Sequence, residues 1–498
     1  MTTLTHPLPA RFDLIVVGSG PNGTIVANEV YRRRTDVSIL VVETGPEISA
    51  NAGEHLIESP DKEARQAYER LMRLAKQIEY VQGSAADRQL TETLWSKEEV
   101  GIVPAAYLGN DMREFPGAAM AWNIGGMGVH WTAACPRPFG PEIPPAGDGD
   151  WDADLRTAQR LLRVDQTVFA ANPFAHPVLD ALRSALPAAS ADRSAQPMPI
   201  AGVPGPTGKV RRTGPRDIFP ELFSDDDRAR LVTGALCTTI LHHDGVATGV
   251  VLRDVQSGQE VEIAAGAVVV AADALRTPQL LWASGIRPDA LGVRLNEHAS
   301  IDGGVVVDPV RIGATGMRIP EHPLDEPFIG AYWSPSNGAD QPTQGQLMEQ
   351  KSAETGHTIG MGWYVSTEIR PENRLEFSEH ATDAVGLPRI TARFSYSDRD
   401  LERIEFARGI QRAAANAVGD FDQEAAVLLP AGASLHYTGT VRMGAAEDGT
   451  SVCDLRGAVW GFDNLFVAGN GVIPTALTCN ATLTSASLSV RTARSVLA

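Results

Sequence analysis

The feature that most constrains the fold is a glycine-rich turn between a short apolar run and a helical segment near the N-terminus. Residues Phe12 to Val17 read FDLIVV, and an apolar run that leads straight into glycines is typical of a buried parallel strand. The segment from Pro21 to Arg34 has the pattern of a helix, and Val37 to Val42 has that of a second strand. Together they predict a strand–helix–strand unit at the start of an α/β fold.

The turn itself has the spacing G-x-G-x-x-G, formed by Gly18, Gly20 and Gly23. In such a turn the first glycine permits the tight bend, the second lets the backbone approach a pyrophosphate, and the third allows close helix–strand packing. The positive end of the following helix then faces the phosphates. Glu43 closes the second strand about 20 residues further on, where a carboxylate can accept ribose hydroxyls. The pattern predicts a dinucleotide site rather than a chance glycine turn, but it does not separate FAD from NAD.

Composition and charge exclude several classes of protein. The 498 residues exceed one simple core and predict two domains. The net charge of -18 argues against a nucleic-acid partner and against an anionic membrane surface. The first residues, MTTLTHPLPARF, lack the pattern of a secretory signal, and no apolar run approaches the ~18 residues of a spanning helix. We therefore expect a cytoplasmic protein.

The cysteines and histidines do not have the spacing of metal sites. The four cysteines (Cys135, Cys237, Cys453 and Cys479) lie far apart without a CxxC pair, which predicts free thiols in a reducing cytoplasm. The eleven histidines contain no HExxH or similar motif, so no metal is expected.

Further elements follow from the hydrophobic pattern. The charged segment 60–80 is helical in pattern, and 140–225 resembles connections with short helices. Alternating residues in Gly360 to Glu368 and Arg389 to Tyr396 predict a mixed or antiparallel sheet. The other predicted elements are a strand over Ala264 to Ala272, a helix over Leu275 to Ser284, a strand over Asn464 to Ala468 and a last helix over Thr482 to Leu497.

Three blocks of sequence resemble a known family. The first comprises HYTGTVRMG from His436, NLFVAGNGVIPT from Asn464, and NATLT from Asn480. The second is PGAAMAWNIGGMGVHWTAACPRP from Pro116, and the third is NRLEFS from Asn373 with the following Thr382 and Asp383. These blocks resemble the glucose-methanol-choline (GMC) oxidoreductase family, and within it the pyranose oxidase branch, which includes bacterial enzymes that oxidise sugars and glycosides.

The resemblance implies an α/β fold with a Rossmann-like FAD-binding domain and a discontinuous substrate-binding domain that contains an antiparallel sheet. It also implies FAD as the cofactor. The FAD-binding domain would comprise residues 1–50, 110–138, 226–300 and 440–498. Residues 51–109 would form a helical or connecting segment. The substrate-binding domain would comprise residues 139–225 and 301–439.

The resemblance also assigns roles to individual residues. His436 is the candidate base, because imidazole can accept the alcohol proton, or else it is a structural histidine before a turn. Asn480 would hold the substrate oxygen, cap the last helix, or do both. Gln346 corresponds to a substrate-binding glutamine. The residues that would contact the cofactor, besides the glycine turn and Glu43, are Met127, His130, Trp131, Thr132, Cys237, Asn470, Gly471 and Thr482.

The chain departs from the family pattern at two points. The family usually has Asn-Pro where this chain has Asn480 and Ala481, which bears on the rigidity of that turn. Fungal pyranose oxidases have Ser-Thr before the loop histidine, where this chain has Gly128 and Val129. A covalent link between His130 and the flavin methyl group therefore stays open, and packing beside the ring is the alternative.

The predicted function is an FAD-dependent oxidase that converts a secondary alcohol of a sugar or glycoside to a ketone. Position C3 of glycosides is preferred to C2 of free pyranoses, and O2 is the expected acceptor. Three alternatives remain: a dehydrogenase that passes electrons to a quinone or partner protein, a non-redox lyase on the same fold, and an NAD-linked binding protein. The sequence does not predict the oligomeric state.

Overall fold

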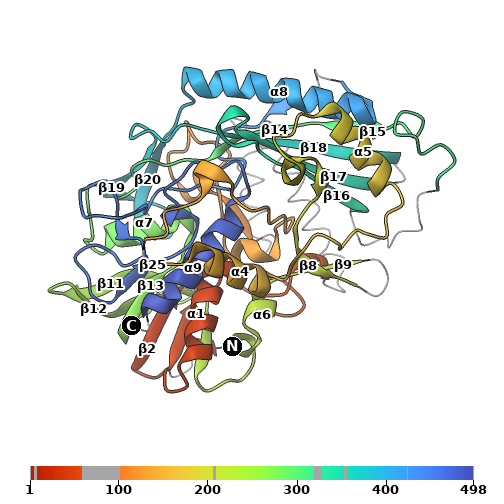
Figure 1. The fold of residues 1–498 in the computed structure, drawn as a ribbon. Coiled ribbons are helices and arrows are strands. Elements are labelled where there is room, and N and C mark those ends of the chain that lie inside the picture. Colours follow the sequence, from red (N-terminus) through yellow and green to blue (C-terminus); the bar gives the residue numbers. More distant parts are fainter. Residues whose placement is uncertain are drawn as a thin grey trace.

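The computed structural model describes residues 2–4, 8–58, 101–147, 149–205, 209–318, 328–352, 356–422, 424 and 426–496. Two large sheets dominate this part of the chain (Figure 1). One is mainly parallel and carries the N-terminal turn, and the other is antiparallel. The predicted α/β fold with an antiparallel sheet is therefore confirmed. The helix predicted over 60–80 lies outside the described residues, and the predicted domain boundaries stay a prediction.

The first sheet has its strands in the order β1-β10-β3-β2-β13-β12-β11, with β25 paired to β13. The long strand β13 joins two parts of this sheet. Its beginning pairs antiparallel with β12, and its end pairs parallel with both β2 and β25. The bounds are β1 Thr2–Thr3, β2 Arg11–Val17, β3 Ile39–Val42, β10 Ala229–Thr233, β11 Ala235–His243, β12 Val246–Asp254, β13 Glu260–Val270 and β25 Leu465–Val467.

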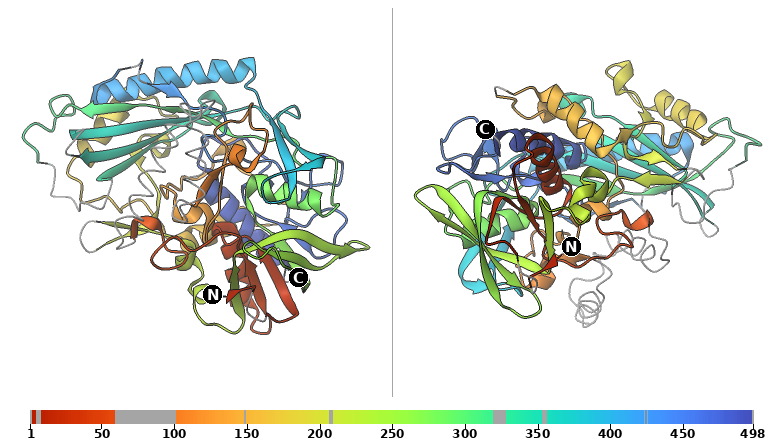
Figure 2. Two further views of the ribbon diagram at one scale, coloured as in Figure 1. Left: turned by 180° about the vertical axis from the view of Figure 1, so that it is seen from behind. Right: turned by 90° about the horizontal axis from the view of Figure 1, so that it is seen from below.

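The first and last helices of the described chain pack side by side on the parallel sheet (Figures 1 and 2). Helix α1 (Pro21–Arg33) follows the glycine turn, and α9 (Ala481–Val496) lies against it. Helix α4 (Trp151–Leu162) covers α9, and its buried Asp154 pairs with Arg491 at 3.0 Å. Helix α7 (Asp273–Ala283) packs against β11.

The predicted elements around the turn are confirmed with small shifts at their ends. Strand β3 begins at Ile39 rather than Val37. The reason is local, because the backbone N–H of Ser38 donates to the Asp13 carboxylate at 2.8 Å, and its hydroxyl donates to the same oxygen at 2.7 Å. Side-chain hydrogen bonds of this kind compete with the strand ladder.

The antiparallel sheet is centred on β18, which pairs with β17, β15 and β14. Helix α8 (Asp398–Val418) lies along this sheet (Figure 1), and their apolar side chains form a separate core. The bounds are β7 Gln196–Pro197, β14 His298–Asp302, β15 Gly304–Val307, β16 Gly330–Ser334, β17 Thr343–Ser352, β18 Gly356–Ser366, β21 Gly419–Asp420 and β22 Val427–Leu428.

Shorter elements connect the two sheets. The predicted alternation at Arg389 to Tyr396 forms β20, which pairs with β19 in a two-stranded ribbon. The remaining bounds are β4 Ile102–Pro104, β5 Ala119–Ala121, β6 Val164–Asp165, β8 Ile200–Pro204, β9 Val210–Arg212, β19 Arg374–Thr382, β20 Pro388–Arg393, β23 Met443–Gly444, β24 Cys453–Asp454, α5 Ala175–Ala185 and α6 Pro215–Ile218. Among the described helices, none has the length and hydropathy to cross a membrane.

Candidate active site

The three glycines of the turn have different surroundings. Gly18 has a φ of +108°, which favours glycine, and a Cβ there would lie 2.4 Å from the Ala271 carbonyl oxygen. A Cβ on Gly23 would lie 2.1 Å from the Gly18 carbonyl oxygen, so helix and strand pack too closely for a side chain. A Cβ on Gly20 would meet no atom within 4 Å. Gly20 borders open space, which a pyrophosphate can approach.

Glu43 closes β3 beside this turn and is buried at 8% exposure. Its carboxylate accepts hydrogen bonds from the Ser19 hydroxyl at 2.6 Å and from the Gly45 backbone at 2.9 Å. Burial raises its pKa, and these donors counter that effect. These bonds, with a third from the Ser19 backbone at 3.2 Å, fix the carboxylate at the wall of a cavity, and its remaining lone pairs can accept ribose hydroxyls.

A cavity of about 440 Å³ runs between the two sheets. Its wall includes the glycine turn and Glu43, and also His436 and Asn480, so the predicted binding and catalytic residues meet in one space. The start of α9 lies at this wall through Thr482, where the positive end of a helix favours negative charge. The other predicted residues on the wall are Met127, His130, Trp131, Thr132, Cys237 and Asn470.

His130 lies on the glycine-rich loop and is almost fully buried. Its Nε2 is 2.9 Å from the Asn123 side-chain oxygen, whereas its Nδ1 is buried without a hydrogen-bond partner in the described part of the chain. Burial lowers the pKa of His130 to about 3, which keeps the ring neutral. A Cβ on the preceding Gly128 would lie 2.6 Å from Pro21. The serine of the fungal enzymes therefore does not fit here, because this loop packs directly on α1.

A second histidine contacts His436. The Nδ1 of His436 is 2.6 Å from the Nε2 of His298, and His298 stacks on Tyr364 with 4.5 Å between ring centroids. Burial lowers the pKa of His436 to about 4 and that of His298 well below its usual value. Both rings are therefore neutral near pH 7, which is the state in which an imidazole can accept a proton.

One arrangement of protons on this pair leaves the Nε2 of His436 free to accept a proton. The Leu477 backbone raises the pKa of His298, which is the effect of a carbonyl that accepts from its ring. A neutral His298 that donates through Nδ1 to this carbonyl can only accept at Nε2. His436 must then donate from Nδ1, which leaves a lone pair on its Nε2. The pair can therefore hold the tautomer that a general base requires.

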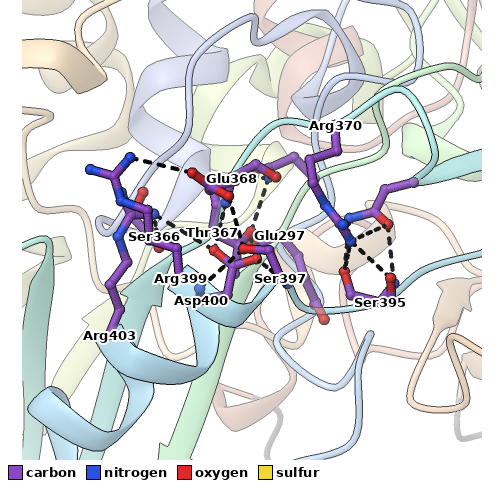
Figure 3. A network of polar contacts seen from close by, with 12 residues as sticks. Glu297, Ser366, Thr367, Glu368, Arg370, Ser395, Ser397, Arg399, Asp400 and Arg403 are labelled. Carbon is purple, nitrogen blue, oxygen red and sulfur yellow. Dashed lines mark hydrogen bonds and ion pairs between the residues drawn. The ribbon is translucent and has the colours of Figure 1, made fainter.

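The buried carboxyl group of Glu297, which is part of the polar network in Figure 3, supports the backbone of His436. Glu297 accepts from the Gly432 backbone at 2.5 Å and from the Ser434 hydroxyl at 2.7 Å, and the same hydroxyl accepts from the His436 backbone at 3.1 Å. Burial raises the pKa of Glu297 to about 8. Because this network holds the chain on both sides of Ala433, it fixes the position of the histidine.

Asn480 is held by a network of side-chain amides. Its nitrogen donates to Gln346 at 3.1 Å, and its oxygen accepts from Gln344 at 3.3 Å. Gln346 in turn donates to the Thr132 hydroxyl at 3.3 Å, which connects the asparagine to the glycine-rich loop. These bonds fix the amide at the cavity wall, and they join it to β17 of the antiparallel sheet rather than to the helix backbone that follows it.

The turn that precedes Asn480 is anchored by Glu142. This carboxylate accepts from the Thr478 backbone at 2.5 Å, from the Cys479 backbone at 3.3 Å and from the Phe139 backbone at 2.8 Å, and the Thr478 hydroxyl also donates to it. Burial raises the pKa of Glu142, and the four donors counter that effect. With Ala481 in place of the usual proline, these hydrogen bonds constrain the turn.

The structure thus brings most of the predicted residues to one cavity. Three do not lie on its wall: Gly23, whose role is packing, Gln346, which supports Asn480, and Gly471, where a Cβ would lie 2.9 Å from the Thr440 hydroxyl. Sequence reasoning missed His298 and Glu142. Their partners lie 138 and 336 positions away along the chain, and no local motif marks either residue.

Comparisons with known proteins agree with this geometry. Two sequence profiles described as GMC oxidoreductase match residues 207–300 and 370–489. A C-glycoside 3-oxidase from Microbacterium trichothecenolyticum is 36% identical over 99% of this chain and 98% of its own length. Another from Arthrobacter globiformis is 36% identical over 98% and 95%. A pyranose 2-oxidase from Tricholoma matsutake is 26% identical over 97% and 93%.

The chain belongs to the GMC oxidoreductase family, and it is an FAD-dependent oxidoreductase. The solved structure of pyridoxine 4-oxidase from Mesorbium loti shares the fold, with a TM-score of 0.63 at 16% identity over 97% of this chain and 99% of the other. The residues present fit the cofactor: Gly20 leaves room for a pyrophosphate, and the unpartnered Nδ1 of His130 lies at the wall of the same cavity.

Proposed function

We propose that this protein oxidises a secondary alcohol of a glycoside to a ketone at C3, with O2 as electron acceptor. The observation that carries the proposal is the presence of two groups on one cavity wall, a histidine whose Nδ1 contacts His298 and an asparagine amide. The choice of glycosides and of C3 is supported by the C-glycoside 3-oxidases that are 36% identical over nearly the whole chain. The pyranose 2-oxidase of Tricholoma matsutake is 26% identical, so it gives weaker support for free sugars as the substrates of this protein.

In the proposed mechanism, FAD supplies the acceptor for the hydride that leaves the carbinol carbon. His436 accepts the hydroxyl proton at Nε2 as the C–O bond becomes a carbonyl. The His298 ring holds His436 in the required tautomer through the 2.6 Å contact at Nδ1. Asn480 keeps the substrate oxygen within reach of that Nε2, because its own amide is fixed by Gln344 and Gln346.

An anaerobic screen of the holoenzyme tests the proposal. Purified enzyme is mixed with free sugars and with O-, C- and N-glycosides, and bleaching of the flavin absorbance is followed. We expect glycosides to bleach the flavin, a 3-keto product by NMR, and hydrogen peroxide when air is admitted. Bleaching by free pyranoses alone, with a 2-keto product, would contradict the choice of substrate. Bleaching without peroxide under air would indicate a dehydrogenase, and the absence of bleaching would indicate a lyase.

The sequence-based expectation of a cytoplasmic protein stays a prediction, as does the covalent link at His130. The free thiols are confirmed, because all four cysteines are buried and unpaired.

A further inference from the structure

An aspartate with an unusual backbone lies on the wall of the cavity that fits FAD. Asp273 is the first residue of α7, lines this cavity and has a φ of +65°. This left-handed region favours glycine, so another residue there is strained unless its surroundings hold it in place. Asp244 has a similar φ of +49°, but it lies in the exposed turn between β11 and β12. The proposed mechanism does not use Asp273.

One oxygen of the Asp273 side chain caps the helix. Its Oδ1 accepts from the Leu275 backbone at 2.5 Å and from the Arg276 backbone at 3.0 Å. Residues that cap a helix in this way normally have an extended backbone, so capping does not require the positive φ. The cap also leaves the second oxygen, Oδ2, for another partner.

The Oδ2 atom has no such partner in the described part of the chain. Asp273 makes no hydrogen bond there besides the two at Oδ1 and no ion pair, and Arg276 pairs instead with Asp383 at 2.5 Å. Burial raises the pKa of Asp273 to about 6, so the group is mainly ionised at pH 7. A charged oxygen in such a place needs a hydrogen-bond donor. Because Asp273 lines the cavity, a bound molecule can supply that donor.

Close packing fixes Asp273 between two loops that line the same cavity. On one side, a Cβ on Gly18 would lie 2.4 Å from the Ala271 carbonyl oxygen, so this backbone rests directly on the glycine turn. On the other side, a Cβ on Gly471 would lie 3.6 Å from the Cα of Ala274. The turn that carries Asp273 therefore lies between the pyrophosphate turn and the loop that follows β25.

The strand order indicates which part of the cofactor is near Asp273. Strands β3, β2, β13 and β25 are parallel neighbours in this order, so the segments that follow them lie at one edge of the sheet. Glu43 follows β3 and suits the ribose, and Gly20 follows β2 and leaves room for the pyrophosphate. Asp273 follows β13, past the pyrophosphate turn on the side away from Glu43. The ribitol chain of FAD is the hydroxyl-bearing group expected on that side.

We infer that Asp273 is a cofactor-binding residue whose Oδ2 accepts a hydrogen bond from a sugar hydroxyl of FAD. The strand order favours a ribitol hydroxyl, and the adenosine ribose is the other source of the same group. An ionised carboxylate forms strong hydrogen bonds with such donors, whereas it would repel the pyrophosphate. The inference concerns the cofactor alone, so it does not depend on the choice of substrate or acceptor.

The affinity of full-length apoprotein for FAD tests the inference without turnover. The dissociation constant is measured by the quenching of flavin fluorescence on reconstitution. Asp273→Asn keeps an oxygen for the cap and tolerates a positive φ, but it removes the charge. We expect it to weaken FAD binding about 10-fold or more, because a charge-assisted hydrogen bond is lost, with an unchanged unfolding midpoint of the apoprotein. An unchanged dissociation constant overturns the inference.

Asp244→Asn is the matched control, because Asp244 has the same type of backbone, is 87% exposed and lies outside the cavity. This variant should bind FAD as the wild type does. If acid precipitation shows that the flavin is covalently bound, all proteins in the comparison carry His130→Ala as well.

FAD analogues identify the hydroxyl and separate a contact from a structural effect. One set lacks single hydroxyls of the ribitol chain, and the other carries 2′-deoxy- or 3′-deoxyadenosine. The analogue that lacks the contacted hydroxyl should bind the wild type about 10-fold more weakly than FAD, but it should bind Asp273→Asn as well as FAD does. A ribitol analogue with this behaviour assigns the ribitol chain, and a deoxyadenosine analogue assigns the ribose. If the losses from variant and analogue are additive for every analogue, there is no contact and the inference is wrong.

A second variant keeps the test available if Asp273→Asn does not fold. Asp273→Gly suits a φ of +65° and removes the acceptor, and the same analogues are compared with it. If neither variant folds, the wild-type protein decides: weaker binding of one ribitol analogue than of FAD supports the contact, and equal binding of FAD and all ribitol analogues overturns it.

Discussion

The pairing of two buried histidines gives a sharp prediction for His298→Ala. This change removes the acceptor that lies 2.6 Å from the Nδ1 of His436 and leaves a buried donor without a partner. Such a loss costs about 1–3 kcal/mol, and each 1.36 kcal/mol corresponds to a factor of ten in rate. The freed ring can also place its proton on Nε2, where it can no longer accept one. We therefore expect flavin reduction to slow by about 10- to 100-fold.

The assay is anaerobic stopped-flow reduction by a glycoside under saturating conditions, with bound FAD and thermal unfolding measured alongside. His298→Gln offers an amide oxygen to the same Nδ1–H and should recover part of the rate. His243→Ala is the control, because this histidine is 84% exposed and pairs with the adjacent Asp244. If His298→Ala keeps its FAD and reduces it at the wild-type rate, the tautomer argument is wrong.

Three further predictions concern the cofactor and the loop around Asn480. Gly20→Ala should fold, because its methyl group meets no protein atom, but it should lose FAD, because the methyl group occupies the space that the pyrophosphate approaches. Gly23→Ala should fail to fold, because its Cβ would lie 2.1 Å from a backbone oxygen. Absorbance at flavin wavelengths and circular dichroism distinguish the two variants, and equal FAD content in both would contradict this prediction. Glu142→Ala should slow flavin reduction and lower the free energy of unfolding by about 1–3 kcal/mol, because four donors lose their acceptor. Denaturant titration measures the loss of stability, and an unchanged midpoint together with an unchanged reduction rate would refute the anchoring role. If the flavin is covalently bound at His130, colour should stay with the acid-precipitated protein and be released in His130→Ala; a covalent flavin that survives this change is attached elsewhere.

Local patterns were sufficient to predict the dinucleotide-binding half of the fold. The turn at Gly18 to Gly23 depends on glycine at fixed spacing, and its flanking elements follow from apolar runs. The order of strands in the antiparallel sheet was not predictable in this way. Its central strand β18 pairs with the preceding strand β17, but also with β14 and β15 from an earlier part of the chain, and pairing between distant segments leaves no signal in the hydrophobic pattern.

The same limit applies to the site. His436 and Asn480 were found because they lie in a block that resembles a family, and Gln346 was assigned on the same basis. The residues that support them were missed, because their roles arise only from tertiary contacts. His298 supports His436 across 138 positions, and Glu142 is far from the loop it anchors. Nothing in the residues beside His298 or Glu142 distinguishes them from ordinary buried polar groups.

The pH dependence of anaerobic flavin reduction tests the central claim, that His436 is the base in a flavin-dependent alcohol oxidation. Burial lowers the pKa of His436 to about 4, so the ring is neutral and able to accept a proton above that pH. The wild-type rate should rise as the pH increases through about 4 and stay level above it. Asn480→Ala should be slower but show the same limb, because an amide does not titrate.

His436→Ala, measured in the same way, should retain FAD, lose this limb and reduce the flavin roughly 10²- to 10⁴-fold more slowly, as removal of a general base typically does. If His436→Ala instead reduces its flavin near the wild-type rate with the acid limb intact, another group is the base and the proposed mechanism is wrong.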